Sequence, residues 1–294
     1  MTVFFFLSAL SLSISINNDG QFTYRHYLLR RFARIFPMYC LAVSAFWLLG
    51  YNSDAAMSSP WDMMDLALHL TFLNLFDARY INSIMGVEWS VPIEMAAYLF
   101  IPLLYYLLLR MGTRGRLAAL LGACAIPILY DVWFDSIHTY LAAIESFSLF
   151  YYLHCFIAGI IAFSYWQGVR LRSAAADGLV VAILMLIGLV CFTFAPRIEL
   201  SLTLLLIGLV LALSRARITR PLFENRAVVF LGNISFSFYL LHFPIVKYLN
   251  RFFEANGQAA PNFVLVLALM LTAALAFLCY EYVEKPFLRM TERR

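Results

Sequence analysis

Charge is scarce in this sequence of 294 residues. Only 13% of its residues are Asp, Glu, Lys or Arg, whereas 63% are hydrophobic and 17% are aromatic. Soluble proteins carry about 25% charged residues, and a soluble domain of this length could not bury so much apolar surface. The composition therefore predicts an integral membrane protein whose apolar side chains face lipid.

Several familiar site patterns are also missing. The five cysteines lie in or beside apolar runs and none forms a Cys-x-x-Cys pair, which argues against a disulfide framework and a zinc site. There is no Walker A loop, His-Glu-x-x-His, Gly-x-Ser-x-Gly or Gly-x-Gly-x-x-Gly motif. The basic residues form short clusters rather than one continuous face, which argues against nucleic acid as a partner. We therefore expect neither a bound metal nor a bound cofactor.

Apolar runs fill most of the chain, and a helix that crosses a bilayer requires about 20 such residues. They predict an all-α, polytopic transmembrane bundle of about nine spans, with residues 1–294 as a single domain. The candidate spans are residues 2–17, 35–51, 91–109, 117–134, 146–166, 178–195, 200–214, 227–246 and 262–283. The stretch 63–76 is amphipathic and too short to span, and we expect it to form an interfacial or re-entrant helix.

The basic residues indicate which loops face the cytoplasm. When the loops between the predicted spans are numbered alternately, 17 of the 21 Lys and Arg residues fall in one set. Cytoplasmic loops are enriched in these residues, so this set is assigned to the inside. The prediction is a multi-pass protein of the cell inner (plasma) membrane with a cytoplasmic C-terminus. An odd number of spans then places Met1 outside, although nothing before it in this sequence would carry it across.

Polar groups recur in four segments at membrane depth, where burying a charge costs about 2.5–3.5 kcal/mol. In the first segment, Arg31 and Arg34 are spaced i, i+3 and share a helix face at the cytoplasmic end of a span. Two guanidinium groups there can bind phosphates through paired hydrogen bonds. The alternative is that they only follow the general preference for positive charge inside.

The second segment covers residues 88–94 and contains a proline that suits the first turn of a helix. Glu94 then lies about one turn inside a membrane-spanning helix. A carboxylate at that depth can act as a general base or pair with an arginine, or it can belong to a purely structural ion pair.

The third segment places Gly232, Ser235, Tyr239 and His242 on one helical stripe. A stripe of small and polar residues either packs helices together or contributes to a site. In the fourth segment Glu284 closes the last span, where it can cap basic loops or meet the cytoplasmic arginines.

These segments, with an apolar element near the start of the chain, resemble the acyltransferase-3 family of integral membrane acyltransferases. The matching elements occur in the family's order and are residues 5–10 (Phe-Phe-Leu-Ser-Ala-Leu), 31–37, 89–94, 231–244 and 284–286. The resemblance implies a membrane-bound O-acyltransferase. Such an enzyme moves an acyl group, usually acetyl, from cytoplasmic acyl-CoA to an extracytoplasmic acceptor such as a surface carbohydrate. Acyl-CoA would be the donor substrate, and the lipid bilayer would surround the protein.

The resemblance also implies roles for individual residues. Those implied in catalysis are Glu94, Arg31 and Arg34. Those implied in binding the acyl donor or the substrate are Ser8, Trp89, Ser90, Ser235, Tyr239, His242 and Glu284.

Two departures from the family pattern change the expectation. Ala9 stands where the family has glycine, which is a mild change. The family has one span more than we find here, and the span expected to be missing is the first, which carries the family's catalytic histidine. We therefore expect an N-terminally incomplete domain that is inactive without that helix. The competing hypothesis is a non-enzymatic membrane protein, either a transporter or an inactive homologue.

Overall fold

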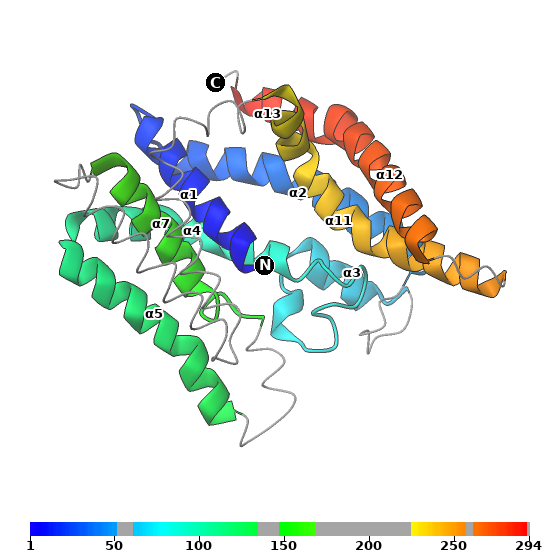
Figure 1. The fold of residues 1–294 in the computed structure, drawn as a ribbon, viewed down its shortest axis with the longest axis horizontal. Helices are drawn as coiled ribbons and strands as arrows, with labels where there is room; N and C mark the ends of the chain where they lie inside the picture. Colours follow the sequence, from blue (N-terminus) through cyan, green and yellow to red (C-terminus); the bar gives the residue numbers. More distant parts are fainter. Residues whose placement is uncertain (52–60, 135–146, 169–224, 257–260, 293–294) are drawn as a thin grey trace. The chain divides into compact units, whose positions relative to one another are not determined.

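The regular structure of the described residues is helical. A computed structural model describes residues 1–51, 61–134, 147–168, 225–256 and 261–292, and within these ranges every regular element is a helix (Figure 1). The prediction of an all-α protein is therefore confirmed for these ranges. The chain divides into two compact units: unit 1 comprises Met1–Tyr24 and Ala96–Leu222, and unit 2 comprises Arg25–Met95 and Phe223–Arg294.

Unit 1 contains α1 (Thr2–Asn18), most of α4 (Ser90–Arg110), α5 (Thr113–Phe134) and α7 (Leu153–Gly168). Within this unit α7 packs against both α1 and α5. Aromatic side chains fill part of the contact between α1 and α7, where the ring centroids of Phe5 and Phe156 lie 5.2 Å apart.

Small residues allow α1 and α7 to approach closely. Ala9 is fully buried, and a Cβ atom at Gly159 would lie 2.9 Å from the Ala9 Cβ atom and 2.5 Å from the Phe6 carbonyl oxygen. Close helix contacts inside membranes commonly use such small residues. A glycine on the facing helix thus accommodates the alanine that departs from the family pattern.

Arg116 of α5 connects α4, α5 and α7. Its Nε donates to the Leu108 carbonyl oxygen at 2.9 Å, and its Nη2 donates to the Leu109 carbonyl oxygen at 3.1 Å. Its Nη1 donates to Ser164 Oγ in α7 at 3.1 Å. The carbonyl groups in the last turn of a helix lack partners within the helix, so this cation both caps α4 and holds unit 1 together.

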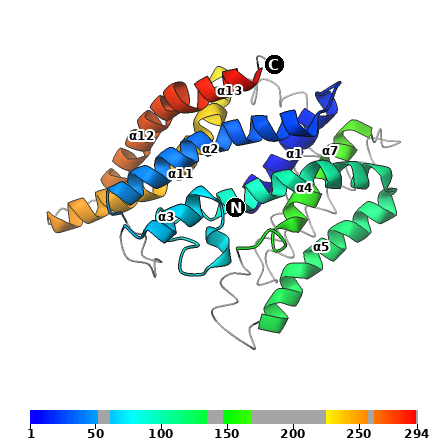
Figure 2. The same cartoon turned by 180° about the vertical axis from the view of Figure 1, so that it is seen from behind.

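Unit 2 carries most of the predicted site residues. Its elements are α2 (Tyr24–Leu48), α3 (Met63–Leu70), the 3-10 turn η1 (Asn74–Phe76), the start of α4, α11 (Arg226–Ala255), α12 (Pro261–Cys279), the π-helical turn η2 (Tyr280–Glu284) and α13 (Lys285–Glu292). α11 and α12 run side by side, as both views show (Figures 1 and 2). Asn225 caps α11 by accepting a hydrogen bond from the Val228 N–H at 2.9 Å.

Among the described residues, three helices are long and apolar enough to cross a membrane by length and composition, namely Ser90–Arg110, Arg226–Ala255 and Asn262–Thr291. The same residues contain the shorter apolar helices Thr2–Asn18 and Leu153–Tyr165. The predicted spans 178–195 and 200–214 lie outside the described residues. A membrane protein of several spans is thus supported, and the number of about nine stays a prediction.

The helix bounds differ from the predicted spans at several ends. The helix expected over 35–51 begins at Tyr24, and the one expected over 146–166 begins at Leu153. Hydropathy detects the stretch that lipid can surround, whereas a helix continues wherever its backbone hydrogen bonds continue. The stretch 63–76 contains the short helix α3 followed by the turn η1, and its interfacial or re-entrant position stays a prediction.

Candidate functional site

Residues 87–90 meet α11 through hydroxyl groups. The Tyr239 hydroxyl donates to the Val87 carbonyl oxygen at 2.6 Å, and its oxygen lies 2.9 Å from Ser90 Oγ. Ser90 is fully buried and is the first residue of α4. The structure thus brings together Ser90 and Tyr239, two predicted site residues that lie far apart in the sequence.

Glu94 lies one turn further along α4 and is only 3% exposed. Its charge acts on Tyr239, as does that of Glu88. Trp89, which precedes Ser90, is half-buried. The start of α4 therefore combines a buried carboxylate with nearby hydroxyl groups, an arrangement that can accept a proton from a reacting group.

A second polar contact joins α11 to the turn that follows α12. The Ser237 hydroxyl donates to Glu284 Oε1, and both side chains are buried. Glu284 is the last residue of the π-helical turn, while Lys285 pairs with Glu281 at 2.5 Å on the half-exposed side of this turn. Isolated π turns are rare and occur often at functional sites.

The two predicted arginines of α2 have different surroundings. Arg34 is exposed, and its charge acts on Glu284. Arg31 is half-buried, and its guanidinium carbon lies 5.8 Å from the centre of the Tyr27 ring, one turn earlier in the same helix. Arg34 therefore belongs with Ser237 and Glu284, and Arg31 lies on the adjacent turn of α2.

Two other predicted site residues of α11 make contacts within that helix. Ser235 is exposed, and its hydroxyl donates within α11 to the Gly232 carbonyl oxygen at 2.8 Å. His242 is half-buried, with Nδ1 2.6 Å from the Tyr239 carbonyl oxygen of the same helix. Ser8 is half-buried in α1, which belongs to unit 1. The expected stripe on α11 is therefore exposed at Gly232 and Ser235 and half-buried at Tyr239 and His242.

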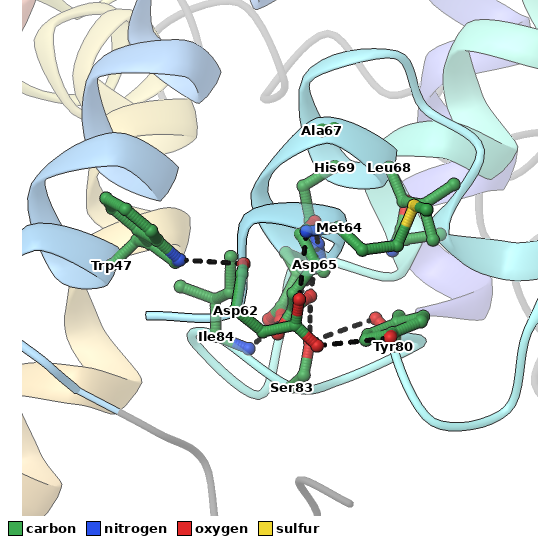
Figure 3. Close-up of polar contacts among 12 residues, drawn as sticks. Trp47, Asp62, Met64, Asp65, Ala67, Leu68, His69, Tyr80, Ser83 and Ile84 are labelled. Atoms are coloured by element: carbon green, nitrogen blue, oxygen red, sulfur yellow. Dashed lines mark hydrogen bonds and ion pairs between the residues drawn. The ribbon is translucent and has the colours of Figure 1, made fainter. Parts of the chain in front are cut away.

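A buried network in α3 and the loop after it was missed by sequence reasoning (Figure 3). His69 is fully buried, with Nδ1 3.0 Å from Asp65 Oδ1 and Nε2 3.4 Å from Glu88 Oε1. Asp65 also accepts a hydrogen bond from Ser83 Oγ at 2.6 Å. The i, i+4 spacing of Asp65 and His69 was the available signal in the sequence.

Another carboxylate holds the beginning of α3. Asp62 accepts a hydrogen bond from the Met64 N–H at 2.9 Å and another from the Tyr80 hydroxyl at 3.1 Å. Its carbonyl oxygen accepts a hydrogen bond from Trp47 Nε1 of α2 at 3.0 Å. Figure 3 shows these contacts at one end of α3. Asp62 thus has a capping role that is separate from the contacts of His69.

The two carboxylates beside His69 decide its charge. Burial alone would lower the pKa of His69, but the hydrogen bonds and charges of Asp65 and Glu88 outweigh burial and raise that pKa from 6.5 to about 9. The imidazole is therefore positively charged at neutral pH. Within the described ranges, no group of three or more His, Cys, Asp and Glu side chains is placed to hold a metal ion.

Comparison with known proteins identifies the family. A family model described as an acyltransferase domain, acyltransferase-3, matches residues 1–281. The acyltransferase MdmB of Streptomyces mycarofaciens is 25% identical over 331 residues, which cover 100% of this chain and 81% of that protein. The putative peptidoglycan O-acetyltransferase YrhL of Bacillus subtilis is 26% identical over 320 residues, which cover 97% of this chain and 49% of that protein.

Another match has a higher percentage identity over a shorter stretch of the chain. A putative O-acetyltransferase of Staphylococcus aureus is 35% identical over 66 residues, which cover 22% of this chain and 11% of that protein. No solved structure matches the chain. Because the family model covers nearly the whole sequence, the chain belongs to the acyltransferase-3 family and is an acyltransferase.

Proposed function

We propose that the protein is a multi-pass O-acyltransferase of the cell inner membrane. It moves an acyl group, acetyl in the simplest case, from cytoplasmic acyl-CoA to an extracytoplasmic acceptor such as a carbohydrate of the cell envelope. The observation that carries the proposal is that Ser237 and Tyr239 of α11 contact two different matched motifs, at Glu284 and at Ser90. Membership of the family supports acyl transfer, and two relatives named as putative O-acetyltransferases support O-acetyl transfer.

The distribution of charge supports the direction of transfer. In the predicted topology Arg34 and Glu284 lie toward the cytoplasmic side of their spans, whereas α3 and the start of α4 lie toward the outer side. Ser237 and Tyr239 differ by two positions, which is about 3 Å along a helix axis. The polar contacts that would serve the donor and the acceptor therefore adjoin each other on α11.

Each group has a distinct role in this proposal. Arg31 and Arg34 bind phosphate groups of acyl-CoA, because guanidinium groups match phosphates through paired hydrogen bonds. Glu284 keeps Arg34 in place. Glu94 accepts the proton of the acceptor hydroxyl as its oxygen attacks the thioester carbonyl, and the proton then passes to the departing CoA thiolate.

The proposal is tested with acetyl-CoA as donor, in membranes of cells that express the native gene. We expect Glu94→Gln to reduce acetyl transfer to envelope material by about 100-fold or more, because a general base contributes at least that factor. Arg34→Ala should raise the KM for acetyl-CoA, because a phosphate partner is lost. Arg25→Ala is the matched control, since Arg25 is an exposed arginine in the first turn of the same helix.

The outcomes separate chemistry from folding. Full transfer by Glu94→Gln would exclude Glu94 as the base, and an unchanged KM in Arg34→Ala would exclude Arg34 from the donor site. Disappearance of either variant from the membrane would assign that residue a structural role. If the wild-type membranes show no transfer from acetyl-CoA beyond that of membranes without the protein, acetyl transfer is the wrong reaction.

A further inference from the structure

His69 is joined to the loop that leads into α4 through the carboxylate of Glu88. Glu88 Oε1 faces His69 Nε2 and accepts the backbone N–H groups of Ile84 at 2.9 Å and Met85 at 3.0 Å. Glu88 Oε2 accepts the N–H of Val87 at 2.8 Å. One buried carboxylate thus fixes three backbone groups of the loop, and His69 is its ionic partner.

Val87 connects this loop to α11 and α4 through hydrogen bonds. Its N–H is bonded to Glu88, while its carbonyl oxygen accepts the Tyr239 hydroxyl at 2.6 Å. The same hydroxyl lies 2.9 Å from Ser90 Oγ at the start of α4. The contacts therefore form a continuous series from His69 to Ser90, and all of its members belong to unit 2.

Charge balance explains why a histidine suits the place between Asp65 and Glu88. The two carboxylates are 3% and 0% exposed, and like charges buried together repel each other and lose hydration. A protonated imidazole offsets part of this cost, because its Nδ1 lies 3.0 Å from Asp65 Oδ1 and 2.9 Å from the Asp65 carbonyl oxygen, while its Nε2 lies 3.4 Å from Glu88 Oε1. A neutral imidazole would leave the two buried carboxylates without this opposite charge.

We propose that His69 is a positioning residue for acyl transfer, which acts through Glu88 to hold residues 84–88 and the start of α4 in the arrangement that the reaction requires. The inference rests on the proposed function, and it adds a residue that neither touches the substrates nor belongs to the matched motifs. In the predicted topology α3 lies at the outer side, so His69 acts on the acceptor end of the site.

Other titratable groups face this network from neighbouring elements: Asp62 and Tyr80 near the start of α3, Tyr39 on α2 and Tyr239 on α11. The tyrosines are neutral at pH 7, so the charge of the network is set by His69, Asp65 and Glu88. Asp62 is bonded to Met64 and Tyr80 rather than to His69, which makes it a suitable control.

The pH dependence of transfer is the first readout, measured with equal pH on both sides of the membrane. The pKa of His69 is raised to about 9, so its charge is complete below pH 6.5 and is lost as the pH rises through about 9. Wild-type transfer should fall along an alkaline limb with its midpoint near that pH. Glu88→Gln removes a carboxylate that raises this pKa, so the midpoint should move down by about one unit or more. Asp62→Asn should leave the midpoint in place.

Turnover is the second readout, with the full chain in lipid nanodiscs, acetyl-CoA as donor and purified peptidoglycan as the probe acceptor. His69→Gln should lower kcat by about 10- to 100-fold, which is the effect of misplacing groups near the chemistry by about 1 Å. The KM for acetyl-CoA should stay within about twofold of wild type, because the groups proposed to bind CoA lie elsewhere.

Amide hydrogen exchange at neutral pH supplies a readout that does not depend on activity. In His69→Gln the amides of Ile84, Met85 and Val87 should exchange about tenfold faster than in wild type, because local opening becomes easier. Asp62→Asn should leave them unchanged.

Three results would overturn the inference. One is unchanged exchange of these amides in His69→Gln, and another is unchanged kcat in the same variant. The third concerns Glu88→Gln. If this variant is less abundant and the midpoint of its alkaline limb of transfer is the same as in wild type, the network has a merely structural role. If wild type itself transfers no acetyl group, the proposed function fails, and the exchange measurement still decides whether His69 holds the loop.

Discussion

Removing the hydroxyl of Tyr239 tests the contact between α11 and the start of α4. In Tyr239→Phe the Val87 carbonyl oxygen loses a donor at 2.6 Å, and Ser90 Oγ loses its neighbour at 2.9 Å. The ring remains, so the apolar packing of this side chain is preserved. The variant therefore isolates the contribution of the polar contacts.

The size of the effect follows from burial. A hydrogen bond contributes about 0.5–1.5 kcal/mol, and a buried polar group left without a partner costs about 1–3 kcal/mol. Tyr239→Phe should lower the free energy of unfolding by about 2–3 kcal/mol, because Val87 and Ser90 both lose a partner. Ser90→Ala removes the contact with Tyr239 and a longer one to the Val87 carbonyl oxygen at 3.5 Å, and should cost about 1 kcal/mol. The loss in the double variant should be smaller than the sum by about 1 kcal/mol, since the shared contact can be lost only once.

The assay is denaturant unfolding of the purified chain in detergent micelles, followed by tryptophan fluorescence. Tyr248→Phe is the control, because Tyr248 is in the same helix and is 65% exposed. Turnover should fall with stability in Tyr239→Phe, since this hydroxyl also fixes residues 87–90. Wild-type stability of Tyr239→Phe, or strict additivity in the double variant, would refute the reasoning.

Three further predictions concern other parts of the chain. Gly159→Val should destabilise the packing of α1 and α7 by about 1–3 kcal/mol, because the new side chain would overlap backbone atoms of α1. The midpoint of thermal unfolding should fall, and an unchanged midpoint would contradict the close approach of these two helices. Ser237→Ala should raise the KM for acetyl-CoA, since Glu284 loses its hydrogen-bond donor. The control Asn233→Ala, on the exposed face of α11, should leave the KM unchanged, and equal KM values in the two variants would exclude a role of Ser237 in the donor site. In a cysteine-free background, an impermeant thiol reagent applied to intact cells should label Met63→Cys and not Thr113→Cys; the opposite pattern would invert the topology.

The sequence predicted helices well where apolar runs were long. Residues 91–109 and 262–283 lie within helices long and apolar enough to span a membrane. α2 was predicted less well, because its first turns carry arginines that lower hydropathy but do not interrupt helical hydrogen bonding.

The faces of α11 show what a sequence pattern leaves open. The stripe rule grouped Ser235 with Tyr239, yet Ser235 is exposed and the buried serine is Ser237. Which face turns inward depends on the partner, here Glu284, and that residue is placed by a π turn. Neither the π turn nor its partner on α11 follows from periodicity, because both depend on contacts between separate helices.

Only one of the two carboxylates beside His69 could be predicted from the sequence. The i, i+4 spacing placed Asp65 beside His69 in any helix over this stretch. Glu88 reaches the same imidazole because the intervening loop folds back and binds its carboxylate through three backbone N–H groups. A loop of this kind has no periodicity, so its path could not be predicted.

The central claim is that an acyl group passes from a cytoplasmic donor to an outer acceptor. It is tested most directly with sealed inside-out membrane vesicles, whose cytoplasmic face is outward, supplied with acetyl-CoA that is radiolabelled in the acetyl group. The account predicts base-labile label inside the vesicles, resistant to external esterase until detergent is added, and strongly reduced in Glu94→Gln at an equal protein level. Label that external esterase removes from intact vesicles, or label that is equal in vesicles without the protein, would contradict it.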